Sequence, residues 1–281
     1  MRKLHFYKMS ACGNDFVVVD NRQRILEDTQ VSDFVQKVCR RRISLGADGV
    51  IFLEESQTAD FSMGFFNADG REVEMCGNGA RCLARFAYLN GLCPNHMVFE
   101  TQAGLIQAEV ISDQVKLKLD YRITPLPSFL LHIDGSERPI FYLTVGVPHV
   151  VNVVEDIEKV DVIGLGQKIR FHDRFQPKGT NANFVKVIDS RKILIRTYER
   201  GVEDETLACG TGSIASSIVC ALLDKVTSPV SVVTRSGSIL KVYYQKVEKD
   251  IFQEIYLQGE ARVVAEGNLW LEEIDIISRE T

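Results

Sequence analysis

The sequence has no apolar run long enough to cross a bilayer, and no apolar signal-peptide core follows the basic residues near its N-terminus. It also contains neither a Walker A pattern nor an H-E-x-x-H pattern, the marks of phosphate-binding loops and zinc proteases. These absences make a cytoplasmic location the expectation and exclude two common kinds of enzyme site.

An excess of positive charge is missing as well. The chain has 33 Lys and Arg against 38 Asp and Glu, a formal net charge of −5, which argues against a nucleic-acid-binding module. The one notable basic run, residues 40–42, is interpreted as a solvated helix end. With 281 residues, 45% of them hydrophobic, the chain is long enough for two globular domains.

Cysteine is present, but not in the patterns of a disulfide or zinc framework. The number of cysteines is odd and no pair has C-x-x-C spacing: Cys12, Cys39, Cys76, Cys82, Cys93, Cys209 and Cys220. Most are expected to be buried as small apolar side chains, and any that does chemistry should stand in a special electrostatic setting. The G-L-G at 164–166 lacks the third glycine of a dinucleotide fingerprint. We therefore expect no metal and no cofactor.

Short β-rich runs bounded by Gly, Asn and Asp dominate the chain. Seven are predicted as strands in the first half: 5–9, 16–20, 49–54, 63–67, 97–104, 106–111 and 115–120. Helices are predicted at 31–42, with Ser32 as a cap, and at 80–91, with Asn90 and Gly91 at its C-terminus. A third helix at 213–225 is apolar nearly all round, which is typical of a buried helix.

Two short segments repeat one pattern: M-C-G-N-G-A-R at 75–81 and A-C-G-T-G-S-I at 208–214. Strands precede each segment and an apolar helix follows it. This predicts an α/β (α+β) fold of two pseudo-symmetric domains, each a strand-rich sheet wrapped around a central helix. We expect the first domain at 1–121, with a tail at 265–281 that packs back on it, and the second at 122–264.

A Cys-Gly-x-Gly segment at a helix start can do chemistry. The first helical N–H groups lack intrahelical partners and carry positive partial charge, and glycines let a ligand approach them, which suits a carboxylate. The same field is expected to lower the pKa of the cysteine. Two such segments facing each other would place an α-carbon between two thiols, so that one removes a proton and the other returns one on the opposite face.

Simpler interpretations exist for each feature. A lone C-G-x-G is more often a turn with a buried cysteine, and Asn67 in N-A-D-G can be a turn former. His149 after Pro148 can be a packed, hydrogen-bonded imidazole.

Segments 8–20, 65–86 and 198–216 resemble the signatures of the diaminopimelate epimerase family, in the expected order along the whole chain. The resemblance implies cofactor-independent conversion of LL-2,6-diaminopimelate to the meso form, for lysine and peptidoglycan precursor synthesis. Cys76 and Cys209 would be the catalytic thiols, with His149 beside Cys76 and Glu199 beside Cys209 to assist proton transfer. Proline racemases share the fold but typically carry His where this chain has Asn78.

The family also implies a set of substrate-binding residues. The contacts to the substrate would come from Asn14, Asn67, Asn181, Glu199 and Arg200, and the reacting carboxylate would be held by Gly77, Asn78, Gly210 and Thr211. Arg200 suits a distal carboxylate because its planar fork binds two oxygens. The partner would be a small amino acid, and the assembly a homodimer, with no nucleic acid and no membrane.

The chain departs from the family pattern at four places. The N-terminal loop loses a His and a Gly at 10–15, Val147 replaces an Asn, Gly49 stands where some members have Gln, and the loop at 201–205 is one residue longer. Two alternatives follow: a racemase of smaller acidic amino acids such as glutamate or aspartate, or a non-catalytic amino-acid-binding or redox-sensing protein. In the last case Cys76 and Cys209 would pair as a disulfide on oxidation.

Overall fold

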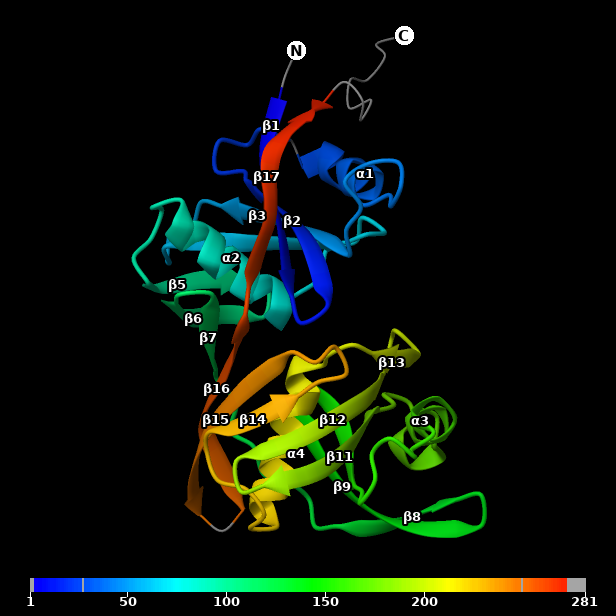
Figure 1. Cartoon of the computed structure of the whole chain (residues 1–281). Helices are drawn as coiled ribbons and strands as arrows, with labels where there is room; N and C mark the ends of the chain where they lie inside the picture. Colours follow the sequence, from blue (N-terminus) through cyan, green and yellow to red (C-terminus); the bar gives the residue numbers. More distant parts are fainter. Residues whose placement is uncertain (1–2, 27, 249, 272–281) are drawn as a thin grey trace. The chain divides into compact units, whose positions relative to one another are not determined.

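The structure is a computed structural model that describes residues 3–26, 28–248 and 250–271. The chain folds into two compact units, one formed by residues up to Leu117 together with the segment from Glu260 onward, the other by Lys118–Gly259. The chain passes from one unit to the other within two strands, β7 (Gln114–Leu119) and β16 (Ile251–Glu260). Figure 1 shows the elements of each unit.

The first unit contains two helices and a set of mixed strands. Its elements are β1 (Lys3–Ala11), β2 (Asn14–Asp20), α1 (Asp28–Val38), β3 (Gly49–Glu54), β4 (Phe61–Asn67), α2 (Gly77–Leu89), β5 (His96–Thr101), β6 (Gly104–Ile111), part of β7 and β17 (Arg262–Trp270). β1 pairs antiparallel with β2 and β17. β2 is parallel to β3, β3 antiparallel to β4, β4 parallel to β5 and β5 antiparallel to β6.

The second unit has the same plan. Its elements are β8 (Phe129–Ile133), β9 (Ser136–Val145), β10 (Val147–Val153), α3 (Val162–Arg170), η1 (Asp173–Phe175), β11 (Asn181–Asp189), β12 (Lys192–Glu199), β13 (Asp204–Thr206), α4 (Gly210–Leu222), β14 (Val230–Val233), β15 (Ile239–Glu248) and β16. β9 pairs antiparallel with β8 and β10, β10 is parallel to β11, β11 antiparallel to β12, β12 parallel to β14, and β14 antiparallel to β15.

The order of parallel and antiparallel pairs is thus the same in both units, and a helix lies in each parallel crossover. α1 and α3 fill the first crossover, and α2 and α4 fill the second. This confirms the predicted α/β fold with two pseudo-symmetric halves. All seven strands predicted for the first half overlap observed strands, although the one at 97–104 runs on through the turn between β5 and β6. Residues 265–270 of the expected tail lie in β17, which pairs with β1, and residues 272–281 lie outside the described residues.

Each unit is built around its second helix, as Figure 1 shows for α2 and α4. α2 contacts β1, β2, β3, β4 and β6, and α4 contacts β9, β10, β11, β12, β14 and β15. Every residue of α4 from Gly212 to Ala221 is buried, so the prediction of a buried helix is confirmed. A helix surrounded by strands in this way has only its ends available to a ligand.

The opposite face of each sheet packs on the first helix of its unit. In the first unit, alternate residues such as Val17 and Val50 pack with Phe34 of α1. In the second, Val150 and Ala182 share a cluster with Ile169 of α3. Since successive side chains of a strand point to opposite faces, the intervening residues face α2 or α4.

The first predicted helix differs from the observed one. α1 spans Asp28–Val38, so Ser32 lies inside the helix and does not cap it. Residues 40–42 follow in a turn, and Arg41 forms ion pairs with Asp15 at 2.7 Å and Asp48 at 2.8 Å. All three residues are exposed after the end of α1, as expected for a solvated helix end, and Arg41 in addition anchors the segments that carry these two aspartates. The C-terminus of α2 is confirmed, with Asn90 as C-cap and Gly91 at a φ of +66°.

Helix α3 was not predicted, because two glycines weaken its helical signal. Asp161 caps it by accepting a hydrogen bond from the Gly164 N–H at 2.9 Å. A Cβ at Gly166 would overlap the Cβ of Tyr198 on β12. The glycine is therefore needed for close packing of α3 on the sheet.

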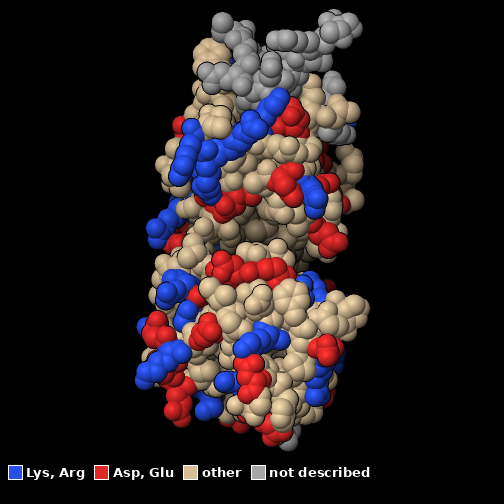
Figure 2. Space-filling view, turned by 90° about the vertical axis from the view of Figure 1, so that its right-hand side faces the viewer, with Lys and Arg blue, Asp and Glu red and all other residues tan. Residues whose placement is uncertain are grey.

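The surface carries both signs of charge. On the face drawn in Figure 2, Lys and Arg are spread among Asp and Glu, and no basic surface extends across it. Among the described residues, no helix is long and apolar enough to span a membrane.

The contact at Gly166 gives a stability prediction. Replacement of Gly166 by Ala should lower the free energy of unfolding by about 1–3 kcal/mol, because the added methyl forces α3 away from Tyr198. Ile163→Ala on the exposed side of the same helix is the control and should change it by less than about 0.5 kcal/mol. Urea unfolding of both variants measures the difference, and equal effects would contradict the packing argument.

Candidate active site

The first Cys-Gly-x-Gly segment forms the start of α2. Cys76 is the N-cap residue, in an extended conformation with φ −133° and ψ 117°, and its side chain is half-buried. Gly77 is the first helical residue, and a Cβ placed on it would meet no atom within 4 Å. The free N–H groups of this helical turn are therefore approachable beside the thiol.

Two predicted binding residues meet at this turn. Asn78 Nδ2 donates to Asn14 Oδ1 at 2.7 Å, and Asn14 Nδ2 donates in turn to Asp48 Oδ2 at 3.0 Å. Asp48 is held by Arg41. The start of β2 is thus fixed to the start of α2, although Asn14 and Asn78 are 64 residues apart in sequence.

Arg81, which the sequence analysis did not name as a site residue, stabilises this arrangement from within the unit. The guanidinium is fully buried, and Nη2 donates to Asn78 Oδ1 at 2.6 Å and contacts Cys12 Sγ at 3.3 Å. Its Nε donates to the Glu260 carbonyl. Cys12, whose place the sequence left open, therefore belongs to the same network. Arg81 could have been noticed in the sequence, because a charged residue inside a largely apolar helix segment directly after Cys-Gly-Asn-Gly is unusual.

Asn67 is the last residue of β4 and its side chain is exposed. Its backbone closes the N-A-D-G turn, with Asn67 N–H donating to the Arg71 carbonyl at 3.0 Å. It is a turn former, and its exposed amide is also available to a ligand. Opposite it in register stands Gly49, where a Cβ would lie 2.5 Å from the Phe66 carbonyl oxygen. This backbone therefore has no room for a larger side chain, such as Gln, at position 49.

The second segment repeats the first in the other unit. Cys209 is the N-cap of α4, with φ −126° and ψ 114°, within 7° of the values at Cys76. The Gly212 N–H donates to its sulfur at 3.3 Å, and Thr211 Oγ1 lies 3.6 Å from the sulfur. The sequence repeat is therefore a repeat of backbone geometry.

The expectation that a helix start lowers the cysteine pKa is wrong for Cys209. Burial, and then the negative charge of Glu199, raise the pKa of this thiol to about 12, against hydrogen bonds from Thr211 and Gly212 that lower it. The pKa of Glu199 is itself raised by burial. Cys209 is thus a protonated thiol at neutral pH, the state of a proton donor. The electrostatic effect of Glu199 on Cys209 also places these two predicted partners near each other.

Asn181 and Arg200 are joined at the ends of neighbouring strands. Asn181 Oδ1 accepts a hydrogen bond from the Arg200 backbone N–H at 2.7 Å. One guanidinium nitrogen, Nη1, donates to the Lys178 carbonyl at 2.8 Å. The remaining donors of the fork can still serve a carboxylate.

His149 lies in the second unit and is fully buried on β10. Its Nδ1 is 3.2 Å from Asn183 Nδ2, and its Nε2 has no hydrogen-bond partner among the described residues. Burial and the nearby charge of Arg200 lower its pKa to about 3. The imidazole is therefore neutral at physiological pH. Its predicted place beside Cys76 joins residues of different units and stays a prediction.

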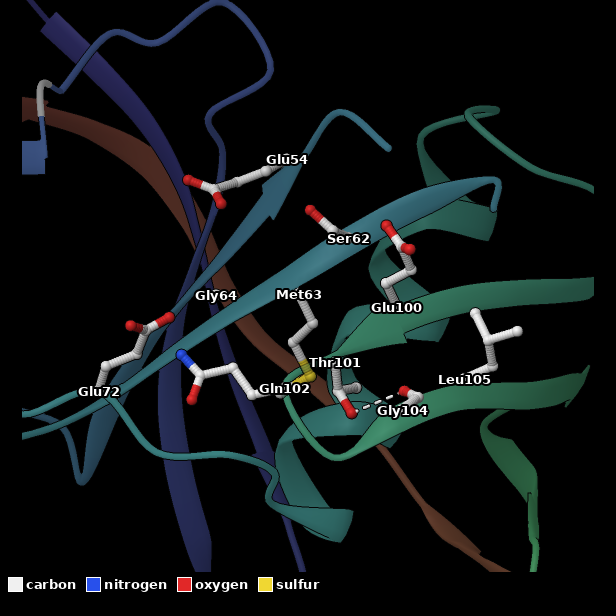
Figure 3. A pocket seen from close by; sticks show the side chains of 10 residues that line it. All are labelled: Glu54, Ser62, Met63, Gly64, Glu72, Glu100, Thr101, Gln102, Gly104 and Leu105. Atoms are coloured by element: carbon white, nitrogen blue, oxygen red, sulfur yellow. Dashed lines mark hydrogen bonds between the residues drawn. The ribbon is translucent and has the colours of Figure 1, made fainter. Parts of the chain in front are cut away.

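A separate pocket of about 370 Å³ opens on the first unit, shown in Figure 3. Three acidic side chains, Glu54, Glu72 and Glu100, lie around it with Gln102. Its lining includes none of the residues predicted for catalysis or substrate binding. The two helix starts therefore form the candidate active site.

Solved structures of other proteins share this fold. A PhzF-family phenazine biosynthesis protein of Bacillus anthracis matches with a TM-score of 0.72 at 18% identity, covering 96% of this chain and all of the other. A probable proline racemase from Agrobacterium radiobacter K84 matches with a TM-score of 0.67 at 12% identity, covering 95% and 93%. These likenesses define the fold class.

Sequence similarity then identifies the family. A family model described as diaminopimelate epimerase matches residues 6–122 and 141–264. The diaminopimelate epimerase of Aquifex aeolicus is 46% identical, covering 95% of this chain and 98% of its own, and that of Hydrogenobaculum sp. is 42% identical, covering 93% and 97%. The chain belongs to the diaminopimelate epimerase family, and it is an isomerase.

The charge environment of Cys209 predicts how this thiol reacts. In a Cys76→Ser background, the rate of Cys209 alkylation by iodoacetamide should rise steadily from pH 7 to pH 10, because the thiolate is the reactive form. Glu199→Gln should speed the reaction at pH 8, since loss of the negative charge lowers the pKa. Thr211→Val should slow it, since loss of the hydroxyl donor raises the pKa. Peptide mass spectrometry follows the modified cysteine.

Because Glu199→Gln should speed the alkylation and Thr211→Val should slow it, a change in reagent access common to both variants cannot explain the pair of results. If Glu199→Gln left the rate unchanged or lowered it, the carboxylate would not control the thiol.

Proposed function

We propose that this protein converts LL-2,6-diaminopimelate to the meso form by two-base proton transfer, with Cys76 and Cys209 as the thiols. The observation that carries the proposal is the repeated geometry: each unit begins its central helix at a cysteine N-cap of the same conformation, followed by Gly-x-Gly. Family membership supports the same substrate.

The proposed reaction needs an acid and a base of the same chemical type on the two faces of one carbon. Cys209, protonated at neutral pH, returns a proton to the α-carbon, and Cys76 as thiolate removes one from the other face. In the reverse direction the roles exchange. The negative charge that develops near the substrate carboxylate is stabilised by the N–H groups of the two helix starts. No electron sink beyond these groups is required.

Recognition of the substrate divides between the two groups of residues. In the first unit, Asn14 and Asn78 are already locked to each other, so they meet the substrate without a loss of side-chain freedom. In the second, Arg200 supplies a guanidinium for the distal carboxylate, next to Asn181. Asn67 completes the set with an exposed amide.

We also propose a wider setting for this activity. The reaction serves lysine and peptidoglycan precursor synthesis in the cytoplasm, and the working form is a homodimer. The partner is a small amino acid, not a nucleic acid or a membrane, in keeping with the mixed charge of the face in Figure 2.

Val147 favours one alternative substrate range. It occupies the start of β10, where relatives carry an Asn expected to help hold the distal end of the substrate. A missing polar partner for a buried group costs about 1–3 kcal/mol. Racemisation of glutamate or aspartate is therefore the second candidate activity, and the same experiment tests it.

Exchange of the α-proton tests the proposal directly. The reduced protein incubated in D₂O with LL-diaminopimelate should catalyse loss of the α-proton signal, and Cys76→Ser or Cys209→Ser should slow it by about 100-fold or more. Proton NMR follows the signal. Parallel incubations with glutamate, aspartate and proline define the substrate range. Absence of exchange with every substrate under reducing conditions would overturn the enzymatic proposal.

The space at Gly77 gives a test of the carboxylate site. Gly77→Ala should leave the melting temperature unchanged, because its Cβ meets no atom, yet raise KM about tenfold, because the methyl stands where the carboxylate approaches. Gly210→Ala is the matched variant, and its Cβ meets Leu257 Cδ2 at 3.0 Å, so it should also lower the melting temperature. An unchanged KM in Gly77→Ala would place the carboxylate elsewhere.

A further inference from the structure

The two units differ at three equivalent buried positions. The third residues of β2 and β3 are Phe16 and Ile51, and Phe65 of β4 lies opposite Ile51. The corresponding residues of the second unit are His149 on β10, Asn183 on β11 and, opposite Asn183, Thr197 on β12. An apolar trio in one unit is thus a polar trio in the other.

The equivalence extends to the central helices. A Cβ added at Gly79 of α2 would touch Ile51, and one added at Gly212 of α4 would overlap Asn183 Oδ1. The polar trio therefore lies against the first turn of α4, where the Gly212 N–H also donates to Cys209. Burial of a polar side chain lowers the stability of a protein unless its donors and acceptors form hydrogen bonds. Such a replacement beside a reactive thiol calls for a chemical reason.

Only one orientation of the Asn183 side-chain amide is consistent with its hydrogen-bond partners. Its Nδ2 lies 2.9 Å from the Val150 carbonyl oxygen, which can only accept, so the NH₂ group must face it. Thr197 Oγ1 donates to Asn183 Oδ1 at 3.0 Å and holds the amide in this orientation. The second hydrogen of the NH₂ group then points to His149 Nδ1 at 3.2 Å.

An NH₂ group donates and does not accept, so the His149 Nδ1 that faces it must carry a lone pair. A neutral imidazole with an unprotonated Nδ1 carries its proton on Nε2. Nε2 is buried and has no partner among the described residues. The imidazole thus has one N–H donor, at Nε2, that has no acceptor among the described residues.

We propose that Asn183, fixed by Thr197, is a positioning residue that holds His149 as the neutral Nε2–H tautomer. His149 then serves the reaction as a hydrogen-bond donor and not as a base at Nε2. The part that concerns the reaction rests on the proposed function. The acceptor is an anionic atom of the reaction, a thiolate sulfur or a carboxylate oxygen of the substrate. The depressed pKa of His149 agrees with a group that stays neutral through the working pH range.

The tautomer is measured by NMR without any substrate. With ¹⁵N-labelled histidine, long-range proton–nitrogen correlation spectra from pH 5 to pH 9 should show one histidine of five that keeps a protonated Nε2 and an unprotonated Nδ1 throughout. Its signal is assigned by its absence from His149→Gln. A His149 signal with Nδ1 protonated, or one that titrates in this range, would overturn the proposal.

Asn183→Asp tests the role of the amide. A carboxylate accepts at this position, so the Nδ1 of His149 should become protonated, and the neighbouring charge should raise its pKa and bring its titration into the measured range. Asn152→Asp is the matched control: Asn152 is a buried residue of β10 on the opposite face from His149, and its variant should leave the His149 signal unchanged. An unchanged tautomer in Asn183→Asp would remove the positioning role.

Kinetics separate a donor from a base. His149→Gln keeps an N–H donor of similar reach but no titratable base, so it should retain kcat within about tenfold, whereas His149→Leu should lose about 100-fold or more. Equal losses in both variants, with melting temperatures near that of the parent, would contradict the donor role. If the NMR result holds while no exchange occurs with any amino acid, the proposed function fails and the tautomer assignment stands.

Discussion

Each unit is built around a central helix whose sides are buried by strands and whose first turn keeps unpaired backbone N–H groups. α2 and α4 are surrounded by strands, so the unpaired N–H groups of their first turns are among the few backbone donors left to a ligand. The glycines after each cysteine serve this arrangement in different ways. Gly77 leaves space for an approaching group, while Gly212 lets α4 pack against Asn183. The cysteine N-cap then places a sulfur beside the donors by backbone geometry alone.

The two copies have the same backbone but different buried side chains. The fifth residue after the cysteine is Arg81 in one helix and Ile214 in the other, both fully buried. The first helix start thus has a cation beneath it, joined to Asn78 and Cys12. At the second helix start, the thiol of Cys209 and the imidazole of His149 are kept neutral mainly by burial. A symmetric scaffold in this way carries an asymmetric electrostatic environment, which is what a reaction that distinguishes two faces of a carbon needs.

Much of this arrangement could be read from the sequence, because it depends on local pattern. The alternating strands, the apolar helix at 213–225 and the repeated Cys-Gly-x-Gly are short-range signals, and each gave the right element. The failures share a cause in long-range contacts. The sequence pattern does not predict helix α3, because it contains Gly166, a poor helix former that is required for packing against Tyr198 more than thirty residues away. The cysteine pKa rule failed at Cys209 because the extent of burial and the nearness of Glu199 are properties of the assembled sheet. Asn183 could not be linked to His149 without knowledge of the parallel register of β10 and β11.

Cys209 and His149 are both uncharged at neutral pH. A buried ion without a partner is costly, and the surroundings of Cys209 and His149 avoid that cost by keeping both groups uncharged. An anion that arrives at the α4 start finds the backbone N–H groups there and, in our proposal, the Nε2–H of His149. In the same proposal, a Cys209 thiolate formed after proton donation keeps the hydrogen bond from the Gly212 N–H and is also stabilised by the Thr211 hydroxyl. Fixed dipoles that need no reorganisation thus replace the water that burial removes.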